Sequence, residues 1–261
     1  MWKQCGRKLG PRKLGYEVLE RRELLAGDLV ISEFLASNST GLQDEDGDRS
    51  DWIEIRNPGP ARQSLAGWYL TDDARDLRKW RFPDVRLAAG GQLVVFASGK
   101  DRSEIPESLH TNFRLDADGE FLAIVQPDGS TVASAYAPAF PPQRAGVSYG
   151  IGEEDAFGFF ATPTPGAAND DEAFAVGFAD DVQLSAERGI YTEPLNVTIS
   201  TETPGASLLY TTDGSAPSPV NGVVVRPTSA NAVPATTLRL SETTILRVMA
   251  VKERWIPSPI V

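Results

Sequence analysis

Short apolar stretches separated by turn residues recur along the first two thirds of the chain. Their length and spacing predict strands over residues 29–35, 52–56, 67–70, 92–97, 120–126 and 131–136. The residues 126–130, Gln-Pro-Asp-Gly-Ser, predict a hairpin, because proline presets φ and Asp-Gly tolerates the positive φ that reverses the chain. Regularly spaced short strands of this kind indicate a sandwich or a barrel.

Alternation resumes after a break. Apolar residues alternate with polar ones over 195–200 and again over 246–250, which predicts two more half-buried strands. Residues 170–182 combine small residues with several Asp and Glu, a composition typical of a linker. We therefore predict a flexible basic head over 1–26, a sandwich over 27–169, an acidic linker over 170–182 and a second sandwich over 183–261.

Composition supports this organisation. A chain of 261 residues accommodates two ordinary domains, and 23 Gly with 19 Pro indicate many turns and few long helices. The expected fold class is all-β, with two β-sandwich domains in tandem. The single cysteine, Cys5, excludes an internal disulfide.

Charge narrows the list of partners. The net charge is −11 and residues 1–25 carry seven Lys or Arg against three Glu, which is +4, so the remainder carries −15. An acidic body without a basic stripe is not expected to bind nucleic acid. No apolar run approaches the roughly 18 residues that a membrane span needs, so no span is expected either.

The head has the basic start of an export signal but no uninterrupted apolar region, because charged residues break residues 14–25. Residues 19–28, Leu-Glu-Arg-Arg-Glu-Leu-Leu-Ala-Gly-Asp, resemble the Leu-Glu-Pro-Arg-x-Leu-Leu heads of large exported planctomycete proteins, with Arg21 in place of the proline. A solvated amphipathic tail is the alternative. The resemblance implies an extracellular or cell-envelope location.

Six sequence pieces in the first segment carry a second resemblance. They are Ile31-Ser32-Glu33-Phe34, Asp51-Trp52-Ile53-Glu54-Ile55, Leu65-Ala66-Gly67-Trp68-Tyr69-Leu70, Lys79-Trp80-Arg81-Phe82-Pro83, Gly90-Gly91-Gln92-Leu93-Val94-Val95-Phe96 and Thr162-Pro163-Thr164-Pro165-Gly166. In this order they resemble a bacterial lamin-tail domain. That resemblance implies an immunoglobulin-like sandwich, usually a non-catalytic module of a larger secreted protein.

The second segment contains Tyr210-Thr211-Thr212-Asp213-Gly214-Ser215-Ala216-Pro217. It resembles the small sandwich at the C-terminus of chitobiases and β-hexosaminidases, which implies an accessory module without active-site residues, and we interpret Asp213 as a turn residue. The family pattern continues for one more strand after Val261. We therefore expect the second sandwich to be truncated here, with a neighbouring strand left as an open edge, and the chain to be the front of a larger protein.

The acidic loop before Trp52 is the candidate metal site. Asp44, Asp46 and Asp48 have the spacing of the first calcium-loop ligands, but the glycine, Gly47, falls at loop position 4 instead of 6, and position 12 is Ile55 instead of the bidentate glutamate of an EF-hand. An irregular Ca²⁺ site formed by these three residues and Asp51 stays open, because Ca²⁺ accepts irregular oxygen cages. A solvated turn without metal is the favoured alternative.

Aromatic residues allow two interpretations. Trp52, Trp68 and Trp80 would stack on sugars if exposed, or fill the core if buried, and the lamin-tail resemblance favours the core, because that family's pattern places such tryptophans inside strands. No nucleophile-elbow or phosphate-binding motif is present, and His110 is the only histidine, so we expect no enzyme. A glycosidase needs only two carboxylates at the right separation, and the sequence does not tell whether any pair of Asp or Glu residues has it.

The function predicted from sequence is a non-catalytic scaffold or adhesion module that meets a protein or polysaccharide of the cell surface. The alternative is a carbohydrate-binding accessory region of a secreted hydrolase. An exposed aromatic row would favour the alternative, and buried tryptophans would favour the scaffold.

Overall fold

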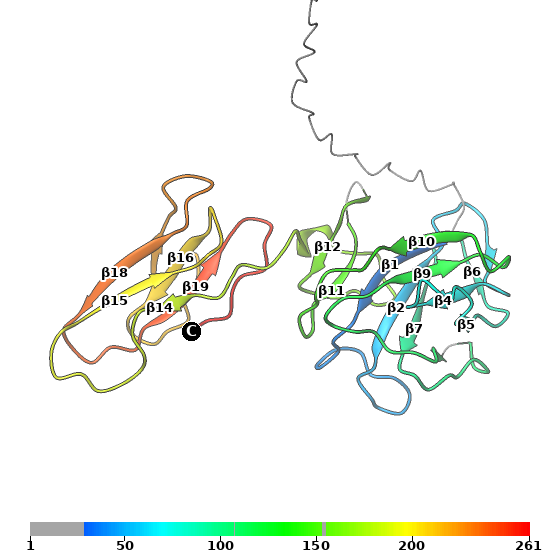
Figure 1. Cartoon of the computed structure of the whole chain (residues 1–261), viewed down its shortest axis with the longest axis horizontal. Coiled ribbons are helices and arrows are strands. Elements are labelled where there is room, and N and C mark those ends of the chain that lie inside the picture. The colour runs from blue at the N-terminus through cyan, green and yellow to red at the C-terminus, as the bar shows by residue number, and fades with distance from the viewer. Residues whose placement is uncertain (1–28, 107, 153–154) are drawn as a thin grey trace, which may run out of the picture.

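A computed structural model describes residues 29–261 except 107, 153 and 154. The predicted head over residues 1–26 lies outside the described residues. Apart from the 3-10 turn Asp171–Ala173, every regular element described is a strand, and no described helix has the length and apolar character to cross a membrane. Figure 1 shows two β-rich bodies, both immunoglobulin-like sandwiches, placed end to end along the longest axis.

The first sandwich packs a seven-stranded sheet against a four-stranded sheet. In spatial order the larger sheet contains β13 (Phe174–Ala175), β12 (Phe157–Phe160), β11 (Ser148–Ile151), β1 (Val30–Leu35), β2 (Asp51–Arg56), β7 (Gln92–Ala97) and β8 (Leu109–His110). The smaller sheet contains β10 (Val132–Tyr136), β9 (Leu122–Val125), β4 (Tyr69–Thr71) and β5 (Trp80–Arg81). A separate pair joins β3 (Gln63–Ser64) to β6 (Arg86–Leu87).

The six strands predicted in this region are all present, within two residues at each end. The predicted hairpin joins β9 and β10, with Gly129 at φ 69° and Asp128 Oδ1 accepting the Ser130 amide at 2.8 Å. The alternation pattern did not predict strands β8, β11, β12 and β13. Their residues include Gly150 and Gly158, which lack a side chain because backbone atoms or the Phe174 ring approach within 3 Å of where a Cβ would lie.

The core lies between the two sheets. Residues from both contribute fully buried side chains, among them Phe34, Ile53, Leu70 and Ile124. Residue Ser32 is an extra residue in β1, because the register passes from Ile31↔Ile55 to Glu33↔Glu54. This bulge breaks simple alternation and places Glu33 beside Glu54, away from the core that Ile31 and Phe34 enter.

The second sandwich has two three-stranded sheets. One contains β14 (Gln183–Leu184), β15 (Leu195–Ser200) and β18 (Ala235–Leu240), and the other contains β17 (Val223–Val225), β16 (Ser207–Thr211) and β19 (Arg247–Val251). Strands β15 and β19 bear out the alternation at 195–200 and 246–250. Asp213 follows β16 and accepts the Ser215 amide at 2.9 Å, the turn role expected of it.

Strand β19 differs from the expected open edge. Val261 and Val248 exchange two backbone hydrogen bonds of 3.0 Å, and the Ser258 amide donates to Ala250 at 3.0 Å. The chain turns back after β19 and runs beside it, so these positions of the strand have partners within the described chain.

Residues 170–182 are structured, whereas their composition suggests a linker with few contacts. Strand β13 adds to the first sandwich, with Phe174 opposite Phe160. Ala179 and Val182 then enter the core of the second sandwich. Asp180 receives a hydrogen bond from the Thr201 hydroxyl at 2.9 Å. The segment differs from a flexible linker because its apolar residues, among them Phe174, Ala179 and Val182, are buried. Its acidic composition does not show this.

A second set of contacts closes the joint between the sandwiches. Residues 176–179 run beside residues 254–256, with Val176 N donating to Arg254 O at 2.8 Å and Ala179 N to Ile256 O at 2.8 Å. The centroids of the Phe178 and Phe159 rings are 4.4 Å apart, and Phe159 belongs to β12. The Arg144 guanidinium lies over the Phe178 ring, 4.3 Å from its centroid. The joint, defined as residues 174–179 with 254–256, therefore bonds to both sandwiches.

Candidate functional site

The acidic loop folds around one of its own carboxylates. Asp44 Oδ1 accepts the backbone amides of Asp46 at 3.1 Å and Asp48 at 3.0 Å, and Ser50 Oγ donates to Asp44 Oδ2 at 2.9 Å. Gly47 provides the positive φ of 83° that closes the turn. The backbone thereby brings the carboxylates of Asp44, Asp46 and Asp48 together, all within 4.8 Å of one another.

Lys100, from the loop that follows β7, places its ammonium among these three carboxylates. Its Nζ lies 2.7 Å from Asp44, 2.7 Å from Asp46 and 2.9 Å from Asp48. Burial opposes its charge, but hydrogen bonds to the three carboxylates outweigh burial and hold the pKa of Lys100 above its usual range. The pKa of Asp44 is lowered, because hydrogen bonds from Lys100 and Ser50 exceed the opposing effect of burial.

Asp51, the fourth predicted ligand, does not join the cluster among the described residues. It begins β2, pairs with Ala97 and accepts the Asn38 amide at 3.3 Å. Burial raises the pKa of Asp51 to about 6 against the opposing effect of that hydrogen bond. The strand register therefore separates Asp51 from the three carboxylates that precede it.

A network that sequence reasoning missed adjoins the loop. His110 is fully buried; its Nδ1 lies 2.8 Å from Ser98 Oγ and its Nε2 lies 2.9 Å from both oxygens of Glu45. Hydrogen bonds from Ser108, His110 and Arg102 lower the pKa of Glu45 to about 2. Burial acts in the opposite direction but is outweighed. Only the pairing of β7 with β8 brings Ser98 and His110 together, so no local motif signals the network.

Serine, histidine and glutamate in this order resemble a nucleophile with its base and orienting acid. Ser98 is 3% exposed, however, and its Oγ also accepts the Lys100 amide at 3.1 Å, while the imidazole stacks on Phe96 at 5.2 Å. A nucleophile has to be reached by its substrate. The burial fits a structural role, in which the network fastens residues 43–48 to β7 and β8.

The three tryptophans lie in the interior, as the favoured interpretation predicted. Trp52 is 0% exposed, Trp80 3% and Trp68 5%. Trp68 and Trp80 belong to the core between the sheets, and Trp80 meets Phe82 edge to face at 4.9 Å. Trp52 packs with Leu35 and Phe96 on the opposite face of the larger sheet. None of the three rings is placed to stack on a sugar at the surface.

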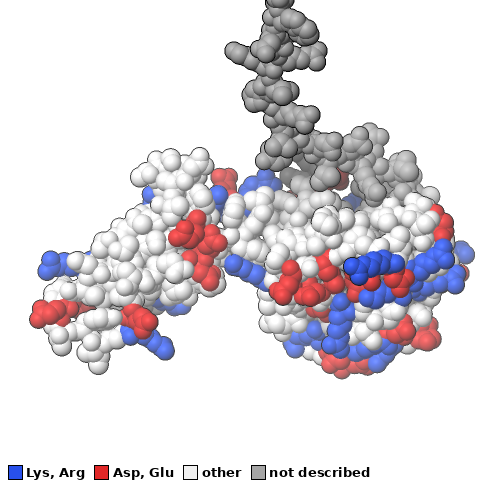
Figure 2. Space-filling view, viewed as in Figure 1, with Lys and Arg blue, Asp and Glu red and all other residues white. Residues whose placement is uncertain are grey.

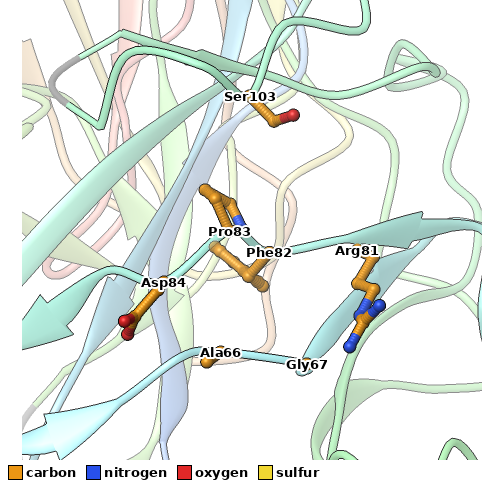
Figure 3. Close-up of a pocket in the computed structure, with 7 residues that line it drawn as sticks. All are labelled: Ala66, Gly67, Arg81, Phe82, Pro83, Asp84 and Ser103. Atoms are coloured by element: carbon orange, nitrogen blue, oxygen red, sulfur yellow. The ribbon is translucent and has the colours of Figure 1, made fainter.

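Two surface depressions are candidates for ligand binding. A hollow of about 430 Å³ lies over Phe82 and Pro83, and Figure 3 shows Arg81 and Asp84 on either side of them with Ser103 reaching in from a separate loop. The seven residues labelled there include one carboxylate and no histidine, so they offer no paired acid and base.

The second depression is a groove of about 610 Å³ in the second sandwich, between residues 184–197 and 240–246. Its lining mixes the apolar Leu195 and Leu246 with hydroxyls and carboxylates such as Thr244 and Glu242. Tyr191 is half exposed there, and its hydroxyl donates to Glu187 O at 2.8 Å, which fixes the ring. Figure 2 shows a second sandwich with few charged side chains on the face drawn, and mixed signs over the first.

The two sandwiches match two families. Residues 25–138 match the Lamin Tail Domain family, and residues 186–261 match the Chitobiase/beta-hexosaminidase C-terminal domain family. No curated protein matches the chain significantly. The first match ends before residues 162–169, which the structure nonetheless places against β1 and β2 of the same sandwich. The chain is therefore similar to a lamin tail domain followed by a chitobiase/β-hexosaminidase C-terminal domain, both non-catalytic immunoglobulin-like modules.

Proposed function

We propose that the protein is a non-catalytic scaffold or adhesion module of the extracellular space or cell envelope. The observation that carries this proposal is the burial of Trp52, Trp68 and Trp80, which commits the largest aromatic surfaces of the first sandwich to packing. On the face of the first sandwich that Figure 2 draws, the charges are of mixed sign, which gives no support to nucleic acid as a partner.

The joint supports the same proposal. A spacer has to transmit position from one domain to the next. Residues 176–179 are hydrogen-bonded to residues 254–256 of the second sandwich, while Phe178 among them packs on Phe159 of the first, so the joint restrains the two sandwiches relative to each other. The partner that fits this role is a protein or polysaccharide of the cell surface. Similarity to two non-catalytic module types in tandem supports the role without naming the partner.

The groove beside Tyr191 favours a second candidate, a carbohydrate-binding accessory region of a secreted hydrolase. A fixed, half-exposed aromatic ring with hydroxyls and carboxylates around it is suited to a sugar, because the ring stacks on a pyranose while the polar groups bond its hydroxyls. Its volume of about 610 Å³ lies in the range of small-molecule sites.

One binding experiment separates the two candidates. The chain is incubated with insoluble chitin and cellulose, and the bound fraction is compared with that of the Tyr191→Ala variant. The scaffold proposal expects no retention above an inert protein. Retention that is lost in Tyr191→Ala but kept in Tyr69→Phe, a control in β4 of the other sandwich, would replace the scaffold by the carbohydrate-binding module.

A further inference from the structure

Two acidic side chains are buried next to each other in the larger sheet. Glu33 of β1 pairs directly with Glu54 of β2, and both are 0% exposed. Side chains of directly opposed residues are about 5 Å apart at Cβ, so the two carboxyls are neighbours. This is the paired carboxylate arrangement that sequence left untested, and it lies closed off from solvent.

Residues 162–169 cover the pair and are attached to the sheet through it. The Thr164 hydroxyl donates to Glu33 Oε2 at 2.9 Å, and the Thr164 amide lies 3.2 Å from both Glu33 oxygens. The Gly166 amide donates to Glu54 Oε2 at 2.7 Å. Asn169 adds a bond from its side-chain amide to Ser32 O at 3.1 Å.

The surroundings supply hydroxyls and amides and little positive charge. Ser148 Oγ donates to Glu33, and Ser32 Oγ donates to Glu54 at 2.5 Å. The charged or titratable groups that act on the pair are each other, Arg56 near Glu54, and Tyr136 near Glu33. No ion pair to either carboxyl is found in the described part of the chain.

Burial is the main reason that protons bind tightly here. It raises the pKa of Glu54 to about 7, against hydrogen bonds from Ser32 and Gly166, and the neighbouring Glu33 raises it further. Burial raises the pKa of Glu33 as well, against bonds from Ser148 and Thr164. Two adjacent carboxyls titrate as a pair, and the second negative charge is the costly one.

We propose that Glu33 and Glu54 form a proton-dependent latch that holds residues 162–169 on the sheet while the pair keeps a proton and lets them lift when it is lost. The opposite face of β1 and β2 is the packed core, so water reaches two charged carboxylates only by displacing residues 162–169. Those residues lead through the 3-10 turn Asp171–Ala173 into β13, so lifting them loosens the approach to the joint.

Hydrogen exchange tests the latch directly. When residues 162–169 are lifted, Glu54 is solvated and its pKa returns to about 4.5. The equilibrium constant for lifting therefore increases about tenfold per pH unit between about pH 4.5 and pH 7. Protection factors of the Thr164 and Gly166 amides should therefore fall about 100-fold between pH 5 and pH 8.5. Their exchange should depend little on denaturant, whereas that of the core amide of Ile53 should follow global unfolding.

Two variants complete the test. Glu54→Gln keeps the shape and the neutral charge of the protonated carboxyl but cannot titrate, so the pH dependence at Thr164 and Gly166 should shrink to the part that Glu33 contributes. Glu120→Gln removes a different carboxyl with a raised pKa and should leave that dependence unchanged. A ¹³C titration of the Glu33 and Glu54 carboxyls in the unaltered chain decides the matter if Glu54→Gln does not fold. Exchange at Thr164 and Gly166 only at the Ile53 rate, or carboxyls that titrate near pH 4.5, would overturn the latch.

Discussion

The Lys100 ammonium lies 2.7 Å from Asp44 Oδ2, at the place where a cation would sit among the carboxylates of the acidic loop. The side chain of Asp44 is fully buried and that of Lys100 is 19% exposed, so the pair is sheltered from solvent. The loop thus has a cation built into the chain, brought in from 56 residues away.

We expect Lys100 to take the place of Ca²⁺ among the three carboxylates, and this gives the first prediction. Millimolar Ca²⁺ should leave the Tm of the unaltered chain unchanged. Lys100→Gln should lower the Tm by about 5 °C, because a buried carboxylate loses its partner, and added Ca²⁺ should then restore part of the loss. Thermal unfolding with and without Ca²⁺ measures both effects.

Asp46→Asn with Asp48→Asn, added to Lys100→Gln, should remove the Ca²⁺ response while the fold persists. A rise in Tm with Ca²⁺ in the unaltered chain, lost in Asp46→Asn with Asp48→Asn, would instead establish the predicted metal site.

The second prediction concerns pH and Asp51. Its pKa of about 6 in the folded chain lies above the ordinary 3.8, so the folded state binds more protons between these values. Beside the fall up to about pH 7 that Glu54 causes, the contribution of Asp51 to stability therefore falls as pH rises from about 4 to 6 and is flat above. Asp51→Asn should remove this slope and raise the free energy of unfolding by ~2 kcal/mol at pH 7.5. Urea unfolding at pH 4.5 and 7.5 measures it, and a variant less stable than the parent at pH 7.5 contradicts it.

The third prediction tests whether Trp68 stabilises the core, by means of the variant Trp68→Ala. Removing a buried indole should cost about 3–5 kcal/mol, because transfer and cavity terms add. Tyr191→Ala, at a half-exposed ring, should cost well under 1 kcal/mol. Denaturant unfolding of both variants provides the comparison, and equal costs would mean that Trp68 is not packed as described.

Limited proteolysis tests the joint in the fourth prediction. Composition alone predicts cutting anywhere in residues 170–182, whereas the bonds of residues 176–179 predict protection there. Phe178→Ala removes the ring that contacts Phe159 and Arg144, and should open this stretch to protease. Val220→Ala, at a residue 97% exposed, is the control. Rapid cutting of the unaltered chain at 176–179 would show that the joint is loose.

Sequence alone determined the strands whose pattern is local. Alternation over 195–200 and the Asp128-Gly129 turn each depend on residues close in the chain, because a strand has period two and a turn needs particular φ values. The burial of the tryptophans was expected from the lamin-tail resemblance. Both family resemblances were confirmed by the matches to residues 25–138 and 186–261.

Tertiary structure decided what occupies the candidate sites. The partners Asp44 and Lys100, Glu45 and His110, and Glu33 and Thr164 are separated by 56, 65 and 131 residues, so no spacing rule connects them. The bulge at Ser32 also depends on pairing with β2, and it alone places Glu33 beside Glu54. Carboxylates in a sequence show where negative charge is available, but whether a metal, a lysine or a proton balances it is decided by which distant side chains the fold brings near.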